Sequence, residues 1–298
     1  MNKKMGWGII LFALVVVSVI SGISFGQKRE GLVNLKANDV LVPALPSQVK
    51  IKGYVGERID SCIENRVMVQ SIESIIRPFR LRFENNIDGW DWRCEFFGKW
   101  FTSAMLAYSY QPTIQHRSVI EKALTNLLKT QSPNGYIGTY DKRHRLQGWD
   151  IWGIKYTLLG LIAYYDQTKN NRVLEAACKL ADWLLERVGP GKVNIASTGI
   201  PALKGLPSSS ILEPMVLLYE RTRSEKYLDF ARYIVHQWSI PNNLAPTGLR
   251  LIQDALEGVP PSKLGGAPKA YEMTSCFEGL LDLYRVTGEK RYLQAGIR

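Results

Sequence analysis

The sequence contains little histidine and little cysteine. Three histidines and four cysteines occur in 298 residues. The histidines do not pair at helical spacing and the cysteines form no Cys-x-x-Cys motif, so the chain shows neither a complete metal site nor a dense disulfide framework. Cys94 and Cys178 fall within apolar helical patterns, where we expect buried free thiols.

The long apolar run of the sequence lies at its N-terminus. Two lysines precede an uncharged stretch, residues 5–26, which ends in small residues. This order is typical of a secretory signal, and the most apolar part is shorter than the ~20 residues of a spanning helix. We predict a signal peptide over residues 1–26, cleaved near Gly26–Gln27, and a secreted or periplasmic protein without stable membrane insertion. A retained membrane anchor is the alternative.

Acidic residues are too few to balance the basic ones. The formal net charge is +11, and loss of residues 1–26, with two lysines and no acid, leaves +9 (11 − 2). The densest basic cluster, residues 142–145, lacks the stripe of basic and aromatic residues that a nucleic-acid surface needs. We expect no nucleic-acid partner; an affinity for acidic polymers or a solvated loop explains the charge.

Strand signals are weak, whereas one sequence phrase recurs four times. A tyrosine is followed by a threonine three residues later, then by a basic and an apolar residue. The threonines are Thr113, Thr168, Thr222 and Thr287, spaced by 55, 54 and 65 residues. A period of this size marks stacked structural units. Because apolar-rich helical patterns precede each phrase and amphipathic ones follow it, the phrase predicts the turn of a helical hairpin.

Long connections precede the apolar-rich helices, over residues 132–149, 189–207 and 239–268. Uninterrupted connections of this length are usually functional or disordered. If the hairpins stack side by side, these connections emerge at one end with the N-termini of the inner helices, which carry partial positive charge. We expect the threonine turns at the opposite end.

Aromatic and charged residues gather where the inner helices begin. Aromatic rings stack on the C–H faces of sugars, and charged groups bind hydroxyls. The pattern favours an oligo- or polysaccharide substrate, although Asp150 also suits a helix cap and the tryptophans also suit packing. The predicted substrate-binding residues are Trp90, Glu95, Tyr136, Asp150, Trp152, Lys155, Lys269 and Glu272.

Five segments carry a family resemblance: VKIKGYVGER (49–58), CEFFGKW (94–100), SPNGYIGTYD (132–141), WDIWGIKYTLLGLIAYYDQT (149–168) and KAYEMTSCFEGLLDLYRVTG (269–288). Together they resemble the β-L-arabinofuranosidase-like glycoside hydrolase family of the six-hairpin glycosidase superfamily, formerly a domain of unknown function. The resemblance implies an (α/α)6 toroid with β-sandwich additions. It also implies retaining cleavage of L-arabinofuranosides by a zinc-bound cysteine thiolate and a glutamate acid/base.

Several positions depart from that family. Lys155 and Lys269 stand where the resemblance implies substrate-facing histidines, and Ser208 stands at a comparable third place. We expect the two ammonium groups to approach one cavity, where they suit a uronic acid or a sulfated sugar. The family's catalytic Glu-x-Cys motif is not found, so we expect the catalytic residues beyond Arg298 and zinc only in the full-length protein.

These observations predict an all-α fold, an incomplete (α/α)6 toroid of about four hairpins. Residues 27–48 form an N-terminal extended segment, and residues 49–298 a partial catalytic toroid, truncated at its C-terminus. The predicted function is that of an exported glycoside hydrolase acting on plant or microbial polysaccharide side chains, L-arabinofuranoside-like or acidic. A polysaccharide lyase or sugar epimerase on the same toroid, or a noncatalytic helical-repeat carbohydrate-binding protein, are the alternatives.

Overall fold

The computed structural model describes residues 33–37, 40–41, 43–82, 92–266 and 269–298. Within these ranges the regular structure is helical, and extended segments pair only at isolated bridges. The prediction of an all-α fold is therefore confirmed. None of the helices described here combines the length and apolarity needed to cross a membrane. The predicted signal peptide lies outside the described residues.

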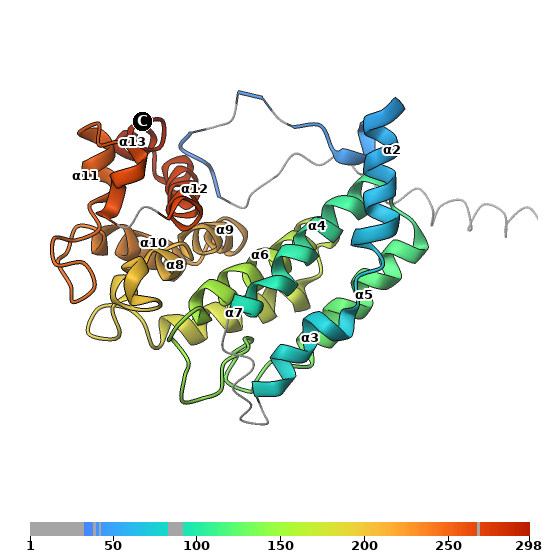
Figure 1. The fold of residues 1–298 in the computed structure, drawn as a ribbon, viewed down its shortest axis with the longest axis horizontal. Helices are drawn as coiled ribbons and strands as arrows, with labels where there is room; N and C mark the ends of the chain where they lie inside the picture. Colours follow the sequence, from blue (N-terminus) through green and yellow to red (C-terminus); the bar gives the residue numbers. More distant parts are fainter. Residues whose placement is uncertain (1–32, 38–39, 42, 83–91, 267–268) are drawn as a thin grey trace, which may run out of the picture.

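Four helix pairs follow one another along an arc (Figure 1). The inner helices contact each other from one pair to the next, α4 with α6, α6 with α9 and α9 with α12. Each inner helix is followed by an outer partner. The pairs are α4 (Phe96–Tyr110) with α5 (Ile114–Leu128), α6 (Asp150–Thr168) with α7 (Asn171–Leu185), α9 (Leu212–Thr222) with α10 (Glu225–Gln237), and α12 (Ala270–Thr287) with α13 (Lys290–Gly296).

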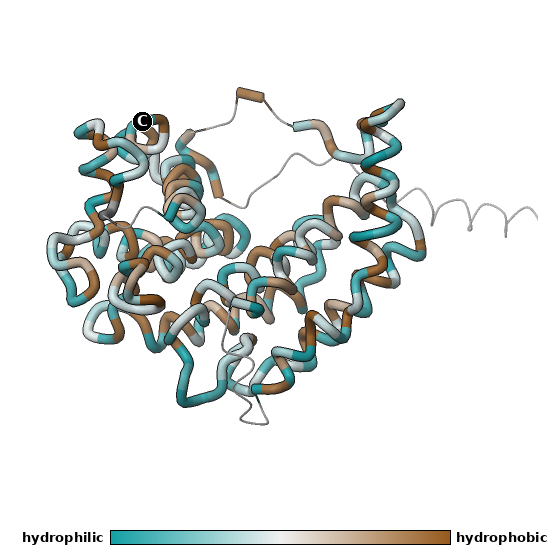
Figure 2. Tube along the Cα trace, viewed as in Figure 1, coloured by the Kyte–Doolittle hydropathy of each residue, from teal (hydrophilic) through white to brown (hydrophobic). Residues whose placement is uncertain are grey.

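Among the helices of the four pairs, α6 is the most enclosed, with 13 of its 19 residues buried. Its neighbours α4, α7 and α9 cover it from several sides, and the outer helices show more polar residues along their lengths (Figure 2). The contact between α4 and α6 is close because Gly98 has no side chain. A Cβ atom there would lie 2.1 Å from the Tyr156 carbonyl oxygen. Such proximity brings the side chains at the starts of both helices together.

Among the residues that the structure describes, three helices of five or more residues precede the first pair, and they were not predicted. They are α2 (Gly53–Cys62), the π-helix η2 (Ile63–Val67) and α3 (Ile72–Leu81), which packs on α5. A 3-10 turn, η5 (Trp92–Glu95), leads directly into α4.

The N-terminal segment lies on the open side of the arc (Figure 1). The backbone N–H groups of Lys36 and Ala37 donate to the Arg285 carbonyl of α12, at 2.8 and 3.1 Å. Farther along, the 3-10 turn η1 (Pro46–Gln48) packs on α4. The backbone N–H of Ile51 then donates to the Tyr110 hydroxyl at 3.4 Å. The segment thus contacts both the first and the fourth pair.

The threonines of the recurring phrase close three of the turns. Thr168, Thr222 and Thr287 end α6, α9 and α12, and each hydroxyl donates to the carbonyl four residues earlier at 2.7–2.8 Å. Each also accepts the N–H two residues later, at 3.2–3.3 Å. The intervening residue has positive φ, which Gly288 adopts without steric cost. A single threonine therefore ends one helix and starts the next.

The first occurrence of the phrase behaves differently. Helix α4 ends at Tyr110, and Thr113 is the N-cap of α5, with its hydroxyl accepting the His116 N–H at 3.1 Å. The turn here is longer, because Gln111 and Pro112 lie between the helix end and the cap. The phrase therefore marks a helix turn in this repeat too, but its threonine caps the second helix instead of ending the first.

The long connections contain short helices, so the expectation that they are uninterrupted is wrong for two of them. Residues 189–207 hold η6 (Ile195–Ser197), η7 (Pro201–Leu203) and the start of α8 (Leu206–Ser209), and residues 239–268 hold α11 (Leu251–Leu256) and η8 (Pro261–Gly266). The third inner helix begins at Leu212 instead of Ser208. Pro214 suits the first turn of α9, where its missing N–H costs nothing. An isolated bridge between Gln147 and Gly199 joins the first two connections.

Candidate functional site

The starts of three inner helices meet through direct side-chain contacts. The Trp152 indole N–H of α6 donates to the Glu95 carboxylate, which directly precedes α4. The hydroxyls of Tyr156 on α6 and Tyr271 on α12 lie 2.5 Å apart. At the other end of the array, Arg221 of α9 pairs with Asp166 of α6 at 2.6 Å. These contacts confirm that the inner helices run side by side in one direction.

Four rings form an aromatic cluster at this junction. The Trp152 ring has edge contacts with Trp149, Tyr156 and Tyr271, at centroid distances of 6.0, 5.1 and 5.4 Å. The Tyr271 side chain is 48% exposed, whereas Trp152 is 1% exposed. The aromatic cluster therefore extends from the interior to the solvent.

Three lysines lie beside the aromatic cluster, and each is paired with a glutamate. Lys99 lies 2.8 Å from Glu95, and its ammonium stands 4.8 and 4.7 Å from the ring centroids of Tyr156 and Tyr271. Attraction to ring faces adds to the pairing.

The two lysines that were predicted as site residues also have carboxylate partners. The Lys269 ammonium lies 2.5 Å from Glu272 and 4.7 Å from the Trp149 ring centroid. The Lys155 ammonium lies 3.4 Å from the Oε2 of Glu213, at the start of α9, and close to the rings of Trp152 and Tyr156. Lys269 is an exposed lysine, whereas Lys155 is buried. A buried lysine needs an anionic partner, and Glu213 supplies it.

Glu213 has a strongly perturbed acidity. Burial raises the pKa of its carboxyl from 4.5 to about 7, and the nearby acids Glu278 and Asp282 of α12 also raise it. The ammonium of Lys155 opposes these effects without cancelling them. The pKa therefore lies where the carboxyl titrates near neutral pH.

Tyr136 and Asp150 form a separate group under the 132–149 connection. The Tyr136 hydroxyl donates to Asp150 Oδ1 at 2.5 Å, and the Leu146 N–H donates to Oδ2 at 2.8 Å. The guanidinium groups of Arg82 and Arg145 lie 5.1 and 4.0 Å from the Tyr136 ring centroid. Burial raises the pKa of Asp150 to about 6. These contacts hold the connection against the start of α6.

The structure therefore divides the predicted site residues. It brings Glu95, Trp152, Lys155, Lys269 and Glu272 together around the aromatic cluster, while Tyr136 and Asp150 bind each other, and Trp90 lies outside the described residues. Substrate contact by any of these residues stays a prediction.

Sequence reasoning did not select four residues of the junction, namely Lys99, Tyr156, Glu213 and Tyr271. Spacing could have identified two of them, because Lys99 and Tyr156 follow Glu95 and Trp152 by one helical turn. Glu213 had no such signal, since its partner Lys155 lies on another helix.

Cysteine and metal chemistry has limited support in the described part of the chain. No three of its histidine, cysteine, aspartate and glutamate side chains converge as a metal-ligand set. Cys94 is buried and Cys178 is partly buried, and no disulfide joins any of the four cysteines, all of which lie in the described residues. Cys276 is buried in α12, which raises the pKa of its thiol to about 12. A thiolate at this position is therefore disfavoured, and we assign no catalytic step to it.

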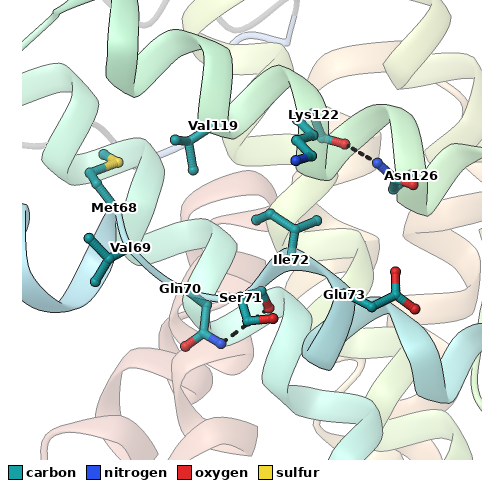
Figure 3. Close-up of a pocket in the computed structure, with 9 residues that line it drawn as sticks. All are labelled: Met68, Val69, Gln70, Ser71, Ile72, Glu73, Val119, Lys122 and Asn126. Atoms are coloured by element: carbon teal, nitrogen blue, oxygen red, sulfur yellow. Dashed lines mark hydrogen bonds between the residues drawn. The ribbon is translucent and has the colours of Figure 1, made fainter.

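A further pocket lies on the outer layer, between residues 68–73 and α5 (Figure 3). Its single carboxylate, Glu73, pairs with Arg80 at 2.6 Å. The remaining lining residues are mainly aliphatic or amide side chains. This pocket lacks the aromatic rings and paired carboxylates of the junction.

The chain is similar to known glycosidases in sequence and in fold. The family model described as β-L-arabinofuranosidase, GH127 catalytic domain, matches residues 57–259. A non-reducing end β-L-arabinofuranosidase of Bifidobacterium longum subsp. longum is 25% identical over 151 residues, which cover 46% of this chain and 22% of the relative.

Two solved structures share the fold. A GH127 β-arabinofuranosidase has a TM-score of 0.63 at 17% identity, covering 85% of this chain and 42% of that one. A GH127 β-L-arabinofuranosidase from Geobacillus stearothermophilus T6 has a TM-score of 0.61 at 17% identity, covering 84% and 44%. The chain spans less than half the length of these relatives. With its helix pairs and with two thirds of its length matched, the chain belongs to the GH127 β-L-arabinofuranosidase catalytic-domain family.

Proposed function

We propose that the protein is an exported glycoside hydrolase that acts on side chains of plant or microbial polysaccharides. L-arabinofuranoside-like sugars are the first candidate substrate, in keeping with the names of the relatives. One observation carries the proposal: the aromatic cluster lies beside the carboxylates of Glu95 and Glu272 at the junction of the inner helices.

The chemistry of this junction suits a sugar. The partly exposed ring of Tyr271 offers a face for the C–H surface of a furanose or pyranose. Carboxylates and ammonium groups nearby can accept from and donate to hydroxyls. The N-termini of α6 and α12 add partial positive charge. Acidic sugars are the second candidate substrate, on the observation that three lysines converge here.

The proposal concerns sugar binding and does not assign the chemical steps of the reaction to particular residues. Zinc enters the proposal only through the family resemblance, for the full-length protein. The described residues of this chain are proposed to bind and orient the sugar, and we assign neither nucleophile nor acid/base group among them.

The test is glycosidase activity of the protein expressed from its complete open reading frame. We expect release of p-nitrophenol from p-nitrophenyl β-L-arabinofuranoside at a higher kcat/KM than from p-nitrophenyl pyranosides. Tyr271→Ala should lower kcat/KM at least about tenfold, whereas Tyr54→Ala, at an exposed tyrosine of α2, should not. Formation of unsaturated products, without hydrolysis of any glycoside, would instead identify a lyase.

A further inference from the structure

Four carboxylates near the starts of the inner helices differ in how many of their oxygens have donors. Both oxygens of Glu95 are engaged, one by Lys99 and one by the Trp152 indole. Both oxygens of Asp150 are also engaged, by Tyr136 and Leu146. The protein itself therefore supplies a donor to every oxygen of these two carboxylates.

Glu213 and Glu272 differ from these two residues in their second carboxylate oxygen. Among the residues that the structure describes, the Oε2 atoms of both are buried without a hydrogen-bond partner. The Oε2 of Glu213 lies 3.4 Å from the Lys155 ammonium, outside hydrogen-bond geometry. Glu272 is 1% exposed, and its other oxygen already accepts from Lys269. Buried acceptors without donors are costly, so each marks a place for a donor from a ligand.

Both carboxylates belong to the same charged group. The Cys276 thiol, one turn after Glu272 on α12, is influenced electrostatically by both Lys155 and Glu272. Since Lys155 also pairs with Glu213, its ammonium lies among the start of α9, the start of α12 and the aromatic cluster.

The lysines of this group already have partners within the protein. Lys99, Lys155 and Lys269 each have a glutamate partner, so no lysine requires an anion from the substrate. An acidic sugar would bring its charge toward the two carboxylate oxygens that have no hydrogen-bond donor, whereas a neutral sugar would bring hydroxyl donors. Groups that lack donors select ligands that supply them.

We propose that Glu213 and Glu272 are specificity-determining residues that accept hydrogen bonds from hydroxyls of a neutral sugar and select against uronic acids and sulfated sugars. The proposal rests on the proposed function, because it names the substrate class of the same site. It reverses the expectation that the lysines recognise an acidic sugar.

Proton linkage supplies a readout that does not depend on activity. Glu213 faces Lys155 from α6 and the acids Glu278 and Asp282 from α12, and its pKa is raised to about 7. A hydroxyl donating to its carboxylate stabilises the ionised form and lowers the pKa. Binding of a neutral sugar near pH 7 should therefore release protons, whereas an anion beside Glu213 would raise the pKa and cause uptake.

The experiment is isothermal titration calorimetry of the full-length protein at about pH 7, in two buffers of different ionisation enthalpy. The probes are methyl β-L-arabinofuranoside and methyl α-D-galacturonide. We expect the arabinofuranoside to bind at least about tenfold more tightly and to release protons. Glu213→Gln should abolish the release, and Glu272→Gln should weaken arabinofuranoside binding about tenfold. Glu289→Gln, at the exposed N-cap position of α13, is the matched control.

The outcomes separate this proposal from the proposed function. Equal or tighter binding of the galacturonide, or arabinofuranoside binding without proton release, overturns the role of the two glutamates and leaves the glycosidase proposal standing. Hydrolysis of neither sugar, with no binding of either probe, overturns both. The number of protons that the unmodified protein releases on binding tests the role of Glu213 even if a variant does not fold.

Discussion

The indole N–H of Trp152 donates a hydrogen bond to the carboxylate of Glu95, a residue 57 positions earlier in the chain. The second oxygen of that carboxylate accepts from Lys99. This contact joins the starts of the first two inner helices and fixes one wall of the aromatic cluster. Glu95 is thereby held by two donors on different helices, so its orientation does not depend on a ligand.

Trp152→Phe should destabilise the protein by about 1–3 kcal/mol, because it keeps most of the buried ring and removes one donor to a mostly buried carboxylate. The free energy of unfolding in urea is the measurement. Trp92→Phe is the control, since Trp92 is 50% exposed, and it should change stability by less than about 0.5 kcal/mol. Equal effects of the two substitutions would show that the indole N–H contributes nothing.

Thr222→Ala should cost about 1 kcal/mol or more, because the threonine hydroxyl both donates to the Leu218 carbonyl and accepts the Ser224 N–H. Thermal unfolding provides the measurement. Thr125→Ala, at an exposed position of α5, should be neutral or stabilising because alanine favours helix. A loss as large at Thr125 would contradict the role given to the turn threonines.

The raised pKa of Glu213 predicts a pH-dependent stability. The pKa is about 7 in the folded protein against an ordinary 4.5, so between these values the folded state holds a proton that the unfolded chain has released. Its contribution is fully present below about pH 4.5 and is lost as the pH rises through about 7.

The unfolding free energy of the unmodified protein, relative to that of Glu213→Gln, should fall by up to roughly 3 kcal/mol across this pH range. Urea unfolding at a series of pH values measures it. The titration of Asp150, whose pKa is also raised to about 6, occurs in both proteins. Asp282, whose pKa is likewise raised to about 6, interacts with Glu213, so its shift in Glu213→Gln is part of the measured difference. A difference that is flat with pH would contradict the burial effect.

Export should be accompanied by cleavage near Gly26–Gln27. Intact-mass spectrometry of the protein recovered from the periplasm or medium should show a chain that begins at Gln27. Recovery of a chain that retains residues 1–26, in the membrane fraction, would instead support the membrane-anchor alternative.

Local patterns in the sequence were sufficient to predict the helix pairs. The spacing of Thr168, Thr222 and Thr287 identified three turns, because one threonine side chain bonds both helices at each turn. Thr113 also marks a turn, but it acts there as the N-cap of α5 instead of ending α4. We predicted the start of the third inner helix too early, at Ser208, because the separate helix α8 precedes α9.

Ion pairs between side chains of different helices could not be predicted from local sequence patterns. Glu95 with Lys99 and Glu272 with Lys269 stand within one helical turn, so their contacts could have been predicted. Lys155 finds its partner Glu213 on another helix, 58 positions later, and depends on how closely α6 and α9 pack. That distance in sequence is why the lysines suggested an acidic sugar.

The N-terminal segment gives the helix array a property that stacked repeats ordinarily lack. In arrays with contacts only between neighbours, the terminal units open first and independently. Here residues 36–37 are bonded to α12, while η1 and Ile51 contact α4. Opening of either terminal unit therefore affects the other, because both units contact the same N-terminal segment. Amide hydrogen exchange in the first and fourth pairs should accordingly slow or quicken together.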